Sequence, residues 1–524
     1  MTNNAKIQKI NNQQIIRNEL FIQKAEQLKP KLIQKTAAPK NMVKIKADPL
    51  AVHGWRADEM KLDFSTSDYG KGEQFILDFG MHQVGYLSMN IIPVGSPPDA
   101  PLHLKLAFGE MPVEMAVPFS GYNGWISSSW LQEETLHVDV MPGVIELPRR
   151  YSFRYIKFEI LDTSPKYRVR FDDIQCVTVS SGDVSTLVPY EPKDKMMHEI
   201  DTVSIKTLQD CMQDVFEDGP KRDRRLWLGD LRLQALANYE TFQNNDLVKR
   251  CLYLFASIPN EKGQVSANLF LSPALIPDDT YLFDYSLLFV CTLYDYYHAT
   301  QDLETLEELW PTALRQLEIG FERLDERDIV VDDDSWWSFI DWHEELNKQA
   351  PSQAVLIYSL RRAIKMAEVL QSDNLEFLNN RLHDIVSATV KHLWDEEKAF
   401  FVSGAKRQIS WASQIWMVLA EVLETEKNYE LLNHLLSEKP EVGLTTPYLY
   451  HYLVDALLLI GEQEKAHSQL KSYWGEMLNA GADTFWELYD PDNKDFSPYG
   501  SPLINSYCHA WSCTPTYFIR KYQL

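Results

Sequence analysis

The chain has 524 residues, of which 51 are Lys or Arg and 75 are Asp or Glu, so its formal net charge is −24. This length exceeds what one hydrophobic core usually serves, and it predicts two domains or one large helical toroid. The acidic balance excludes an extended nucleic-acid or anionic-membrane surface, because either needs clustered Lys and Arg. The composition favours a small neutral or cationic molecule as the partner.

Cysteine usage and hydropathy indicate where such a chain works. The six cysteines are scattered without a CxxC pair or metal-ligand spacing, so we expect reduced core residues, with no disulfide framework and no zinc site. The first twenty residues lack the apolar core of a secretory signal, and the longest apolar runs fall short of about 20 residues. We therefore expect a cytoplasmic protein without a membrane segment.

The first third of the chain is predicted to be mostly β-structure. Residues 1–43 look like a polar, partly helical arm. Residues 44–190 alternate between apolar and polar positions with the period of strands, and Gly and Pro occupy the links between them. Short strands without an intervening helix predict an antiparallel β-sandwich rather than a βαβ unit. The clearest strands are 75–79, 84–92, 102–108, 155–160 and 167–171.

Residues 191–524 form a second domain in which apolar residues recur every 3.6 positions. Roughly twelve helical segments fit this pattern. Twelve helices paired into six hairpins predict an (α/α)6 toroid. The sequence has no regular repeat, which disfavours a solenoid of identical units. The helical segments include 200–216, 231–241, 247–258, 285–299, 303–324, 354–370, 375–394, 411–423, 448–460 and 464–478.

Several tryptophans of the helical domain lie in predicted loops. The simplest interpretation is that they pack over the helix ends, since Trp is highly buried on average. Loop tryptophans beside carboxylates also suit a sugar-binding funnel, in which aromatic faces contact C–H surfaces and acids bind hydroxyls. The tryptophans concerned are Trp227, Trp336, Trp337, Trp342 and Trp486.

A charged loop, residues 217–230, separates two predicted helices. A solvated ion-pair network of small energetic value is its simplest interpretation. Against this, the Leu-Trp-Leu sequence at 226–228 should draw the loop onto the toroid and bury some acids. Burial near other acids raises the pKa of a carboxyl group, whereas neighbouring arginines oppose that shift. The aspartates and arginines of the loop are Asp218, Asp223, Asp230, Arg222, Arg224 and Arg225.

Three later segments combine acids or histidines with aromatic residues. Glu487 stands in an aromatic stretch at 483–490, where a surface or helix-capping glutamate is the competing interpretation. Asp341 precedes Trp342 at 335–343, and His509 lies near the C-terminus at 507–512. A lone histidine is more often structural than catalytic. Because the sequence has no phosphate loop, nucleophile elbow, HExxH or kinase motif, hydrolysis by two carboxylates stays open.

Taken in chain order, these segments resemble the bacterial α-L-rhamnosidases, glycoside hydrolase family 78. The similar segments are Asp-Gly-Pro-Lys-Arg-Asp at 218–223 with Trp227 and Gly-Asp at 229–230, Phe-Ile-Asp-Trp at 339–342, Thr-Phe-Trp-Glu at 484–487 and His-Ala-Trp-Ser at 509–512. Segments at 77–80, 85–87 and 108–110 also resemble the sandwich that precedes this family's catalytic toroid. The resemblance covers about residues 70 to 515, and four ordered segments make it specific.

The resemblance implies an inverting exo-hydrolase that releases terminal α-L-rhamnose from small rhamnosides without a metal or other cofactor. It implies Asp223 as the acid that protonates the leaving oxygen and Glu487 as the base that activates water. Many family members carry Glu as the acid, so a neighbouring loop acid is an alternative donor. The chain would be a minimal form, and a homodimer is one oligomeric state that the sequence allows. The implied sugar-binding residues are Asp218, Arg222, Trp227, Asp230, Asp341, Trp342 and His509.

Two other functions fit the same residues. Another toroid glycosidase or a polysaccharide lyase has the same fold, although a lyase favours a Tyr or His base and cationic residues for a uronate. A non-catalytic carbohydrate-binding protein would keep the tryptophans and would need no poised acid. Nothing in the sequence selects the aglycone.

Overall fold

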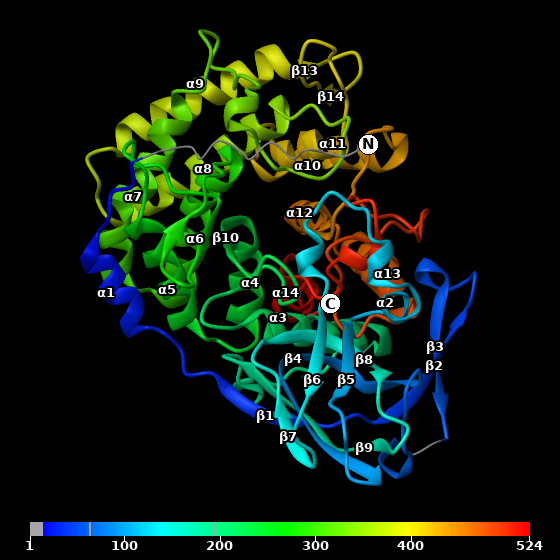
Figure 1. Cartoon of the computed structure of the whole chain (residues 1–524). Coiled ribbons are helices and arrows are strands. Elements are labelled where there is room, and N and C mark those ends of the chain that lie inside the picture. Colours follow the sequence, from blue (N-terminus) through cyan, green and yellow to red (C-terminus); the bar gives the residue numbers. More distant parts are fainter. Residues whose placement is uncertain (1–13, 62–63, 193) are drawn as a thin grey trace.

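The computed structural model describes residues 14–61, 64–192 and 194–524, and it contains a sheet domain beside a ring of helices (Figure 1). Helix α1 (Glu19–Gln27) packs against α5 (Asn245–Ser257) of the helical domain. The stretch expected as a polar arm therefore includes a helix, and it also includes strand β1 (Ile33–Ala37) of the sheet. Its first thirteen residues lie outside the described part of the chain.

The N-terminal domain is an antiparallel sheet, as predicted. Its strands follow the order β1-β9-β4-β8-β5-β6, with β2 and β7 also paired to β4 and β3 paired to β2. The strands after β1 are β2 (Asn41–Ala47), β3 (Trp55–Met60), β4 (Gln74–Gly95), β5 (Leu102–Gly109), β6 (Glu133–Val138), β7 (Gly143–Glu146), β8 (Tyr151–Asp162) and β9 (Tyr167–Ser180).

Strand β4 is shared by two parts of this sheet. Its first part pairs with β2 and β8, and its second part pairs with β7 and β9. The pairing with β8 shifts between Asp78 and Gln83, and Gly80 in this interval has φ of 79°, which glycine adopts without steric cost. The predicted strands 75–79 and 84–92 are thus two parts of one bent strand. One hydrophobic core, which includes Leu77 and Leu87, packs between these parts.

A short helix that the sequence did not reveal interrupts the sheet domain. Helix α2 (Pro112–Ala116) follows β5, and its Glu114 side chain accepts the Met111 N–H at 2.9 Å, which caps the helix. Five residues are too few to produce a helical apolar period. In Figure 1, the cyan segment that follows α2 runs across to the helical ring.

Within the described residues, the C-terminal domain contains twelve helices, α3 to α14, in agreement with the roughly twelve that the sequence predicts. Helices α4, α6, α8, α10 and α12 pack in succession as an inner ring, and α14 closes the ring against α4. The others lie outside it. The helices not yet given are α3 (Lys195–Cys211), α4 (Leu228–Glu240), α6 (Phe283–Thr300), α7 (Leu303–Phe321), α8 (Gln349–Val369), α9 (Leu375–Leu393), α10 (Trp411–Leu419), α11 (Thr425–Glu438), α12 (Pro447–Leu459), α13 (Gln463–Asn479) and α14 (Pro515–Tyr522).

Burial separates the inner helices from the outer ones. In α10, eight of nine residues are buried, because the helix has neighbours on nearly every side. In the outer helix α9, only Leu378, Ile385, Thr389 and Leu393 are buried, at the spacing of one helix face. Among the described residues, no helix is both long and apolar enough to cross a membrane. Helix α3 ends at Cys211, five residues before its predicted end, because Met212 pairs with Phe216 in a β-bridge.

Candidate active site

The loop between α3 and α4 folds back on itself. The Asp218 N–H donates to the Arg225 carbonyl at 3.0 Å, and the Arg225 N–H donates to Asp218 Oδ1 at 2.9 Å. Asp223 and Arg224 at its tip both have left-handed backbone conformations, with φ of 62° and 53°. Such conformations cost about 1–3 kcal/mol each outside glycine, and they persist where the surrounding structure imposes them. The fold therefore fixes the tip that carries Asp223.

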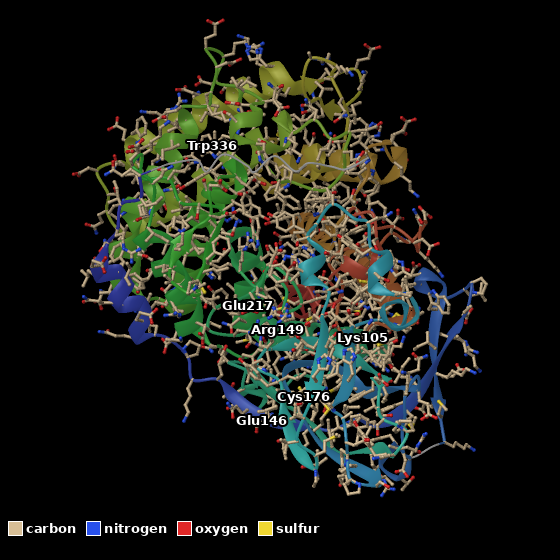
Figure 2. All side chains as sticks on the ribbon, in the orientation of Figure 1. Lys105, Glu146, Arg149, Cys176, Glu217 and Trp336 are labelled. Atoms are coloured by element: carbon tan, nitrogen blue, oxygen red, sulfur yellow. The ribbon has the colours of Figure 1, made fainter. Side chains whose placement is uncertain are left out.

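This loop is buried, so it is not the solvated ion-pair network that its composition also allowed. Its ion pairs reach other parts of the molecule: Arg222 pairs with Glu487, and Glu217 pairs with Arg150 of the sheet domain at 2.6 Å. Figure 2 labels Glu217 at the junction of the two domains. The buried charged residues of the loop are Glu217, Asp218, Lys221, Arg222 and Asp230.

A pocket of about 350 Å³ lies where this loop meets the N-terminal ends of the inner helices. Eight of the nine predicted site residues line it, although they come from four segments far apart in the chain. A larger cavity of about 720 Å³ lies at the C-terminal ends of the inner helices, and none of the predicted residues lines it. The eight pocket residues are Asp218, Arg222, Asp223, Trp227, Asp230, Trp342, Glu487 and His509.

Glu487 is buried and has both carboxylate oxygens engaged. Arg222 donates to Oε2, and the Tyr499 hydroxyl donates to Oε1. The Arg222 guanidinium also lies over the Tyr499 ring, 4.3 Å from its centroid. Burial alone would raise the pKa of Glu487, but Arg222, His509 and Tyr499 hold it below its ordinary value. Glu487 is therefore the acid of this pocket that is poised to be ionised.

Two other acids of the pocket have the opposite tendency. Burial, together with nearby Asp223 and Asp230, raises the pKa of Asp218 well above its ordinary value. Burial and nearby Glu487 do the same to the pKa of Asp230. Asp223 is more open to solvent than these two, with 23% of its side chain exposed, and its Oδ1 lies 3.8 Å from Arg222 Nη1. The pocket therefore combines a carboxylate with acids that favour their protonated form.

Several buried polar atoms at the pocket have no hydrogen-bond partner in the protein. They are the Trp227 and Trp342 Nε1 atoms, Asp230 Oδ1 and His509 Nδ1. Burial lowers the pKa of His509 to about 4, so its imidazole is neutral near pH 7. Buried polar groups are almost always hydrogen-bonded, and a ligand rich in hydroxyls satisfies this set of donors and acceptors.

Asp341 is the predicted site residue that the structure does not bring into the pocket lining. Its carboxylate accepts the Thr445 N–H at 2.8 Å, the Thr446 hydroxyl at 2.6 Å and the Trp342 N–H at 3.0 Å. Thr446 is the N-cap of α12. Burial, opposed by these hydrogen bonds, raises the pKa of Asp341 to about 6. Asp341 thus fixes the start of α12 and the backbone of Trp342 rather than facing the pocket.

The sequence did not single out several residues that line the pocket. Trp125 and Ile126 come from the sheet domain, in the segment after α2, and Tyr499 follows Glu487 in the chain. Trp125 Nε1 donates to the Pro498 carbonyl at 3.0 Å. A Cβ atom on Gly124 would lie 2.5 Å from the Tyr499 carbonyl oxygen, so only glycine allows this close approach. Residues 117–131, which include Trp125, contain no charged residue, and the charged residues at 490–495 before Tyr499 form no motif that points to a site. Only spatial proximity reveals the two segments.

One cluster of metal-ligating side chains occurs among the described residues: His82, Asp210 and Cys508 offer atoms within 4.8 Å of one another. The side chains of this cluster form a network of hydrogen-bonded charged groups. His82 Nδ1 lies 2.7 Å from Asp210, His82 Nε2 lies 3.0 Å from Glu110, and Lys206 also binds Asp210 at 2.6 Å. Burial would lower the pKa of His82, but Cys508, Asp210 and Glu110 raise it well above its ordinary value. A protonated imidazole has no lone pair for a metal.

Known protein families match most of the chain. Residues 39–178 match the glycosyl hydrolase family 78 alpha-rhamnosidase N-terminal domain. Residues 189–522, more than half of the chain, match the bacterial alpha-L-rhamnosidase six-hairpin glycosidase domain. No curated protein gives a significant match.

Solved structures show the same arrangement of domains. A rhamnosidase from Klebsiella oxytoca with rhamnose bound is 51% identical, with a TM-score of 0.96, and the match covers 98% of this chain and 100% of that chain. The rhamnosidase of Bacillus sp. GL1 is 20% identical with a TM-score of 0.74, and the match covers 88% of this chain and 49% of that chain. A Streptomyces avermitilis α-L-rhamnosidase complexed with L-rhamnose is 15% identical with a TM-score of 0.65, and the match covers 94% of this chain and 44% of that chain.

Proposed function

The chain belongs to the bacterial α-L-rhamnosidases, glycoside hydrolase family 78, and from this premise we propose that it releases terminal α-L-rhamnose from small rhamnosides with inversion at the anomeric carbon. The observation that carries the proposal is a single pocket that holds an ionised Glu487 together with the three aspartates of the 217–230 loop. The Klebsiella oxytoca relative with rhamnose bound supports rhamnose as the sugar.

Glu487 is the general base of this proposal. Its ionised form accepts a proton from a water molecule, and the hydroxide that results attacks the anomeric carbon. The Arg222 pair and the Tyr499 hydrogen bond support this role, because both favour the carboxylate over the acid. An inverting pair of carboxyl groups stands about 6.5 to 9.5 Å apart to leave room for this water, and we expect that separation between Glu487 and the acid.

Asp223 is the general acid, which donates its proton to the glycosidic oxygen as the bond to the sugar breaks. Its place at the tip of the buried loop and its partial exposure support this role, because a donor must reach an oxygen that lies between the sugar and the departing group. Asp218 is the alternative donor, since its raised pKa favours the protonated form. Substrates with different leaving groups distinguish Asp223 from Asp218 as the proton donor.

The remaining pocket residues bind the sugar. The unpartnered atoms of Asp230, His509, Trp227 and Trp342 supply donors and acceptors for ring hydroxyls. Rhamnose is a 6-deoxy sugar, so its methyl group needs an apolar surface, and Phe339 is among the apolar residues of the lining. A volume of about 350 Å³ is at the small end of ligand pockets and suits one monosaccharide, which supports exo action.

The leaving group lies at the rim of the pocket between two exposed tryptophans. Trp125 from the sheet domain is 69% exposed, and Trp337 is 39% exposed. Large aromatic side chains exposed beside a buried polar pocket provide a contact surface for a second ring. The sheet domain would thereby contribute directly to substrate binding.

The same pocket weighs against the two alternatives. Arg222 is its only Lys or Arg among the described lining residues, and Glu487 already engages it, so no cation is free for the carboxylate of a uronate. A polysaccharide lyase therefore fits poorly. A purely carbohydrate-binding protein would not need a carboxylate that is held ionised beside acids whose pKa is raised.

The six cysteines support a reducing compartment such as the cytoplasm. All of them are buried and unpaired in the structure. Disulfides are rare in cytoplasmic proteins, and unpaired buried cysteines behave as small apolar core residues.

NMR of the first-formed sugar tests the central claim. An α-rhamnoside should release β-rhamnose before mutarotation if water attacks directly from the side opposite the leaving group. Release of α-rhamnose would make Glu487 a nucleophile instead of a base. A panel of 4-nitrophenyl glycosides that differ only in the sugar tests the specificity, and a faster reaction with another sugar would overturn the rhamnosidase assignment.

A further inference from the structure

A buried carboxylate of the sheet domain contacts the catalytic loop directly. Glu114 of α2 has a fully buried side chain, and its Oε2 accepts the backbone N–H groups of Glu110 and Met111 at 2.7 and 2.9 Å. Its Oε1 lies 2.6 Å from Lys221 Nζ, whose side chain is also almost fully buried. Two backbone donors therefore fix Glu114 in place, and Glu114 in turn fixes Lys221.

Lys221 passes this constraint to a segment that flanks the pocket. Its ammonium donates to the Leu503 carbonyl at 3.0 Å and to the Asn505 carbonyl at 2.7 Å. Together with Glu114, these acceptors satisfy all three of its donors. Arg222, the next residue, donates from Nε to the Ile504 carbonyl at 3.0 Å. Two consecutive cations of the catalytic loop thus hold the carbonyls of three consecutive residues, 503–505.

The same arginine then reaches Glu487. Arg222 Nε is occupied by Ile504, which orients the guanidinium so that Nη2 meets Glu487 Oε2. The Glu487 backbone is fixed from the same side, because its N–H donates to the Ser506 carbonyl at 3.0 Å. The position of the base relative to Arg222 therefore depends on segment 503–506.

A second carboxylate of the sheet domain holds the far end of this segment. Glu110 Oε2 accepts the Tyr507 N–H at 2.7 Å, and Glu110 Oε1 accepts the Ser152 hydroxyl at 2.8 Å and lies 3.0 Å from His82 Nε2. Residues 503–507 are thus held by Glu114 through Lys221 at one end and by Glu110 at the other. The sheet domain supplies both carboxylates.

We propose that Glu114 is a positioning residue for hydrolysis: through Lys221 it holds segment 503–505 and Arg222 in the geometry that places Arg222 on Glu487. This inference rests on the proposed role of Glu487 as the base. Glu114 touches neither substrate nor reacting atoms. It acts on the rate because a small misplacement of a catalytic group, even from a change far from the chemistry, slows a reaction by about 10²-fold.

Two variants test this inference. Glu114→Gln removes the charge but keeps the shape. The double variant Glu114→Gln/Lys221→Met replaces the buried pair with neutral side chains of similar volume, an exchange that proteins often tolerate without loss of stability. Asp201→Asn is the matched control, because Asp201 pairs with Arg520 at 2.9 Å and is also buried, but the pair lies away from the pocket. Rhamnose binding by calorimetry gives the fraction of competent sites, so kcat is expressed per competent site.

We expect kcat per competent site to fall by about 10- to 100-fold in both variants with KM within about twofold, whereas Asp201→Asn keeps both values. The acidic limb of the pH profile should move to higher pH, because Glu487 loses part of its contact with Arg222. The other polar groups that face Glu487, namely Tyr499, His509 and Asp230, are unchanged in the variants. If Glu114 acted only through its negative charge, its loss would move the acidic limb to lower pH. If Glu114 only supported the fold, the acidic limb would stay in place. Either result would overturn the inference.

A crystal structure of the double variant decides the question independently of turnover. Arg222 should leave Glu487, and residues 503–505 should shift with it. An unchanged Arg222–Glu487 pair would overturn the role of Glu114, even if the proposed hydrolysis were itself correct. Conversely, failure of the wild-type protein to release rhamnose would overturn the proposed function and leave the structural result valid.

Discussion

The hydroxyl of Tyr499 offers a sharp test of how the pocket sets the charge of its base. Tyr499→Phe removes the donor to Glu487 Oε1 and keeps the ring over which Arg222 lies. A hydrogen bond to a charged group contributes about 1.5–3 kcal/mol, and one pKa unit corresponds to about 1.4 kcal/mol. Because the lost donor favours the ionised form, the pKa of Glu487 should rise by about 1–2 units.

The direction of the change in activity follows from this shift. The reaction requires ionised Glu487, so the acidic limb of the kcat/KM profile should move to higher pH by about 1–2 units. The pKa that this limb reports is a macroscopic constant, because the acids of the pocket titrate together. Arg222 still favours the carboxylate, so the rate on the plateau should change little. The alkaline limb, which reports the acid, should stay in place.

The assay is the pH dependence of 4-nitrophenyl α-L-rhamnoside hydrolysis. Samples taken at each pH are made alkaline before the released 4-nitrophenolate is measured. Tyr167→Phe is the matched control, because the Tyr167 hydroxyl donates to the Ala100 carbonyl at 2.9 Å within the sheet domain and away from the pocket. It should leave both limbs unchanged. An acidic limb of Tyr499→Phe that coincides with the wild-type limb, or that lies at lower pH, would refute the role of Glu487 as the ionised base.

The other predictions concern the proton donor, the rim and metals. Asp223→Asn should slow hydrolysis of alkyl rhamnosides by about 10²- to 10⁴-fold but that of 4-nitrophenyl rhamnoside far less, because only alkyl leaving groups need a proton. Equal losses with both substrates would assign the role of general acid to Asp218. Glu487→Gln should slow both substrates by about 10²- to 10⁴-fold, since both need an activated water, and a selective loss would contradict this. Trp125→Ala should raise KM for aryl rhamnosides by about 2- to 12-fold without changing inhibition by free rhamnose, and a weaker inhibition would place Trp125 at the sugar instead. Activity should survive EDTA, and loss restored by one divalent ion would reveal a metal site.

The predictability of the fold followed the length and regularity of its elements. Long helices such as α7 and α9 carry several turns of apolar periodicity, so the sequence located them to within a few residues. Helix α2 has five residues, too few for a period. Strands β1, β2 and β3 are only partly buried, with burial patterns that do not alternate cleanly, so their sequences looked like an arm or a link. These elements form because other strands supply partners: β9 pairs with β1, β4 pairs with β2, and β2 pairs with β3.

The site was predictable where charge and aromatic residues coincide in one segment. Tyr499 shows the limit, because it carries no motif and acquires its role only where Glu487 and Arg222 meet its ring and hydroxyl. Asp341 is the opposite case, because it has a suggestive sequence context but does not line the pocket. An Asp before a Trp resembles a sugar-binding residue in sequence, yet the N-terminus of α12 takes up its carboxylate oxygens. Local sequence does not reveal which partner a buried carboxylate finds.

The charges in the pocket favour a neutral sugar on physical grounds. Four carboxyl groups, Asp218, Asp223, Asp230 and Glu487, share this small volume with one cation, Arg222. Buried like charges cannot all remain ionised, so Glu487 takes the cation, and burial shifts Asp218 and Asp230 toward protonation. A carboxyl group in its protonated form donates a hydrogen bond to a sugar hydroxyl, which an ionised carboxylate cannot do. A uronate would add a fifth acidic group without a free cation to pair with it, so the pocket disfavours acidic sugars by the same electrostatics that keep its base ionised.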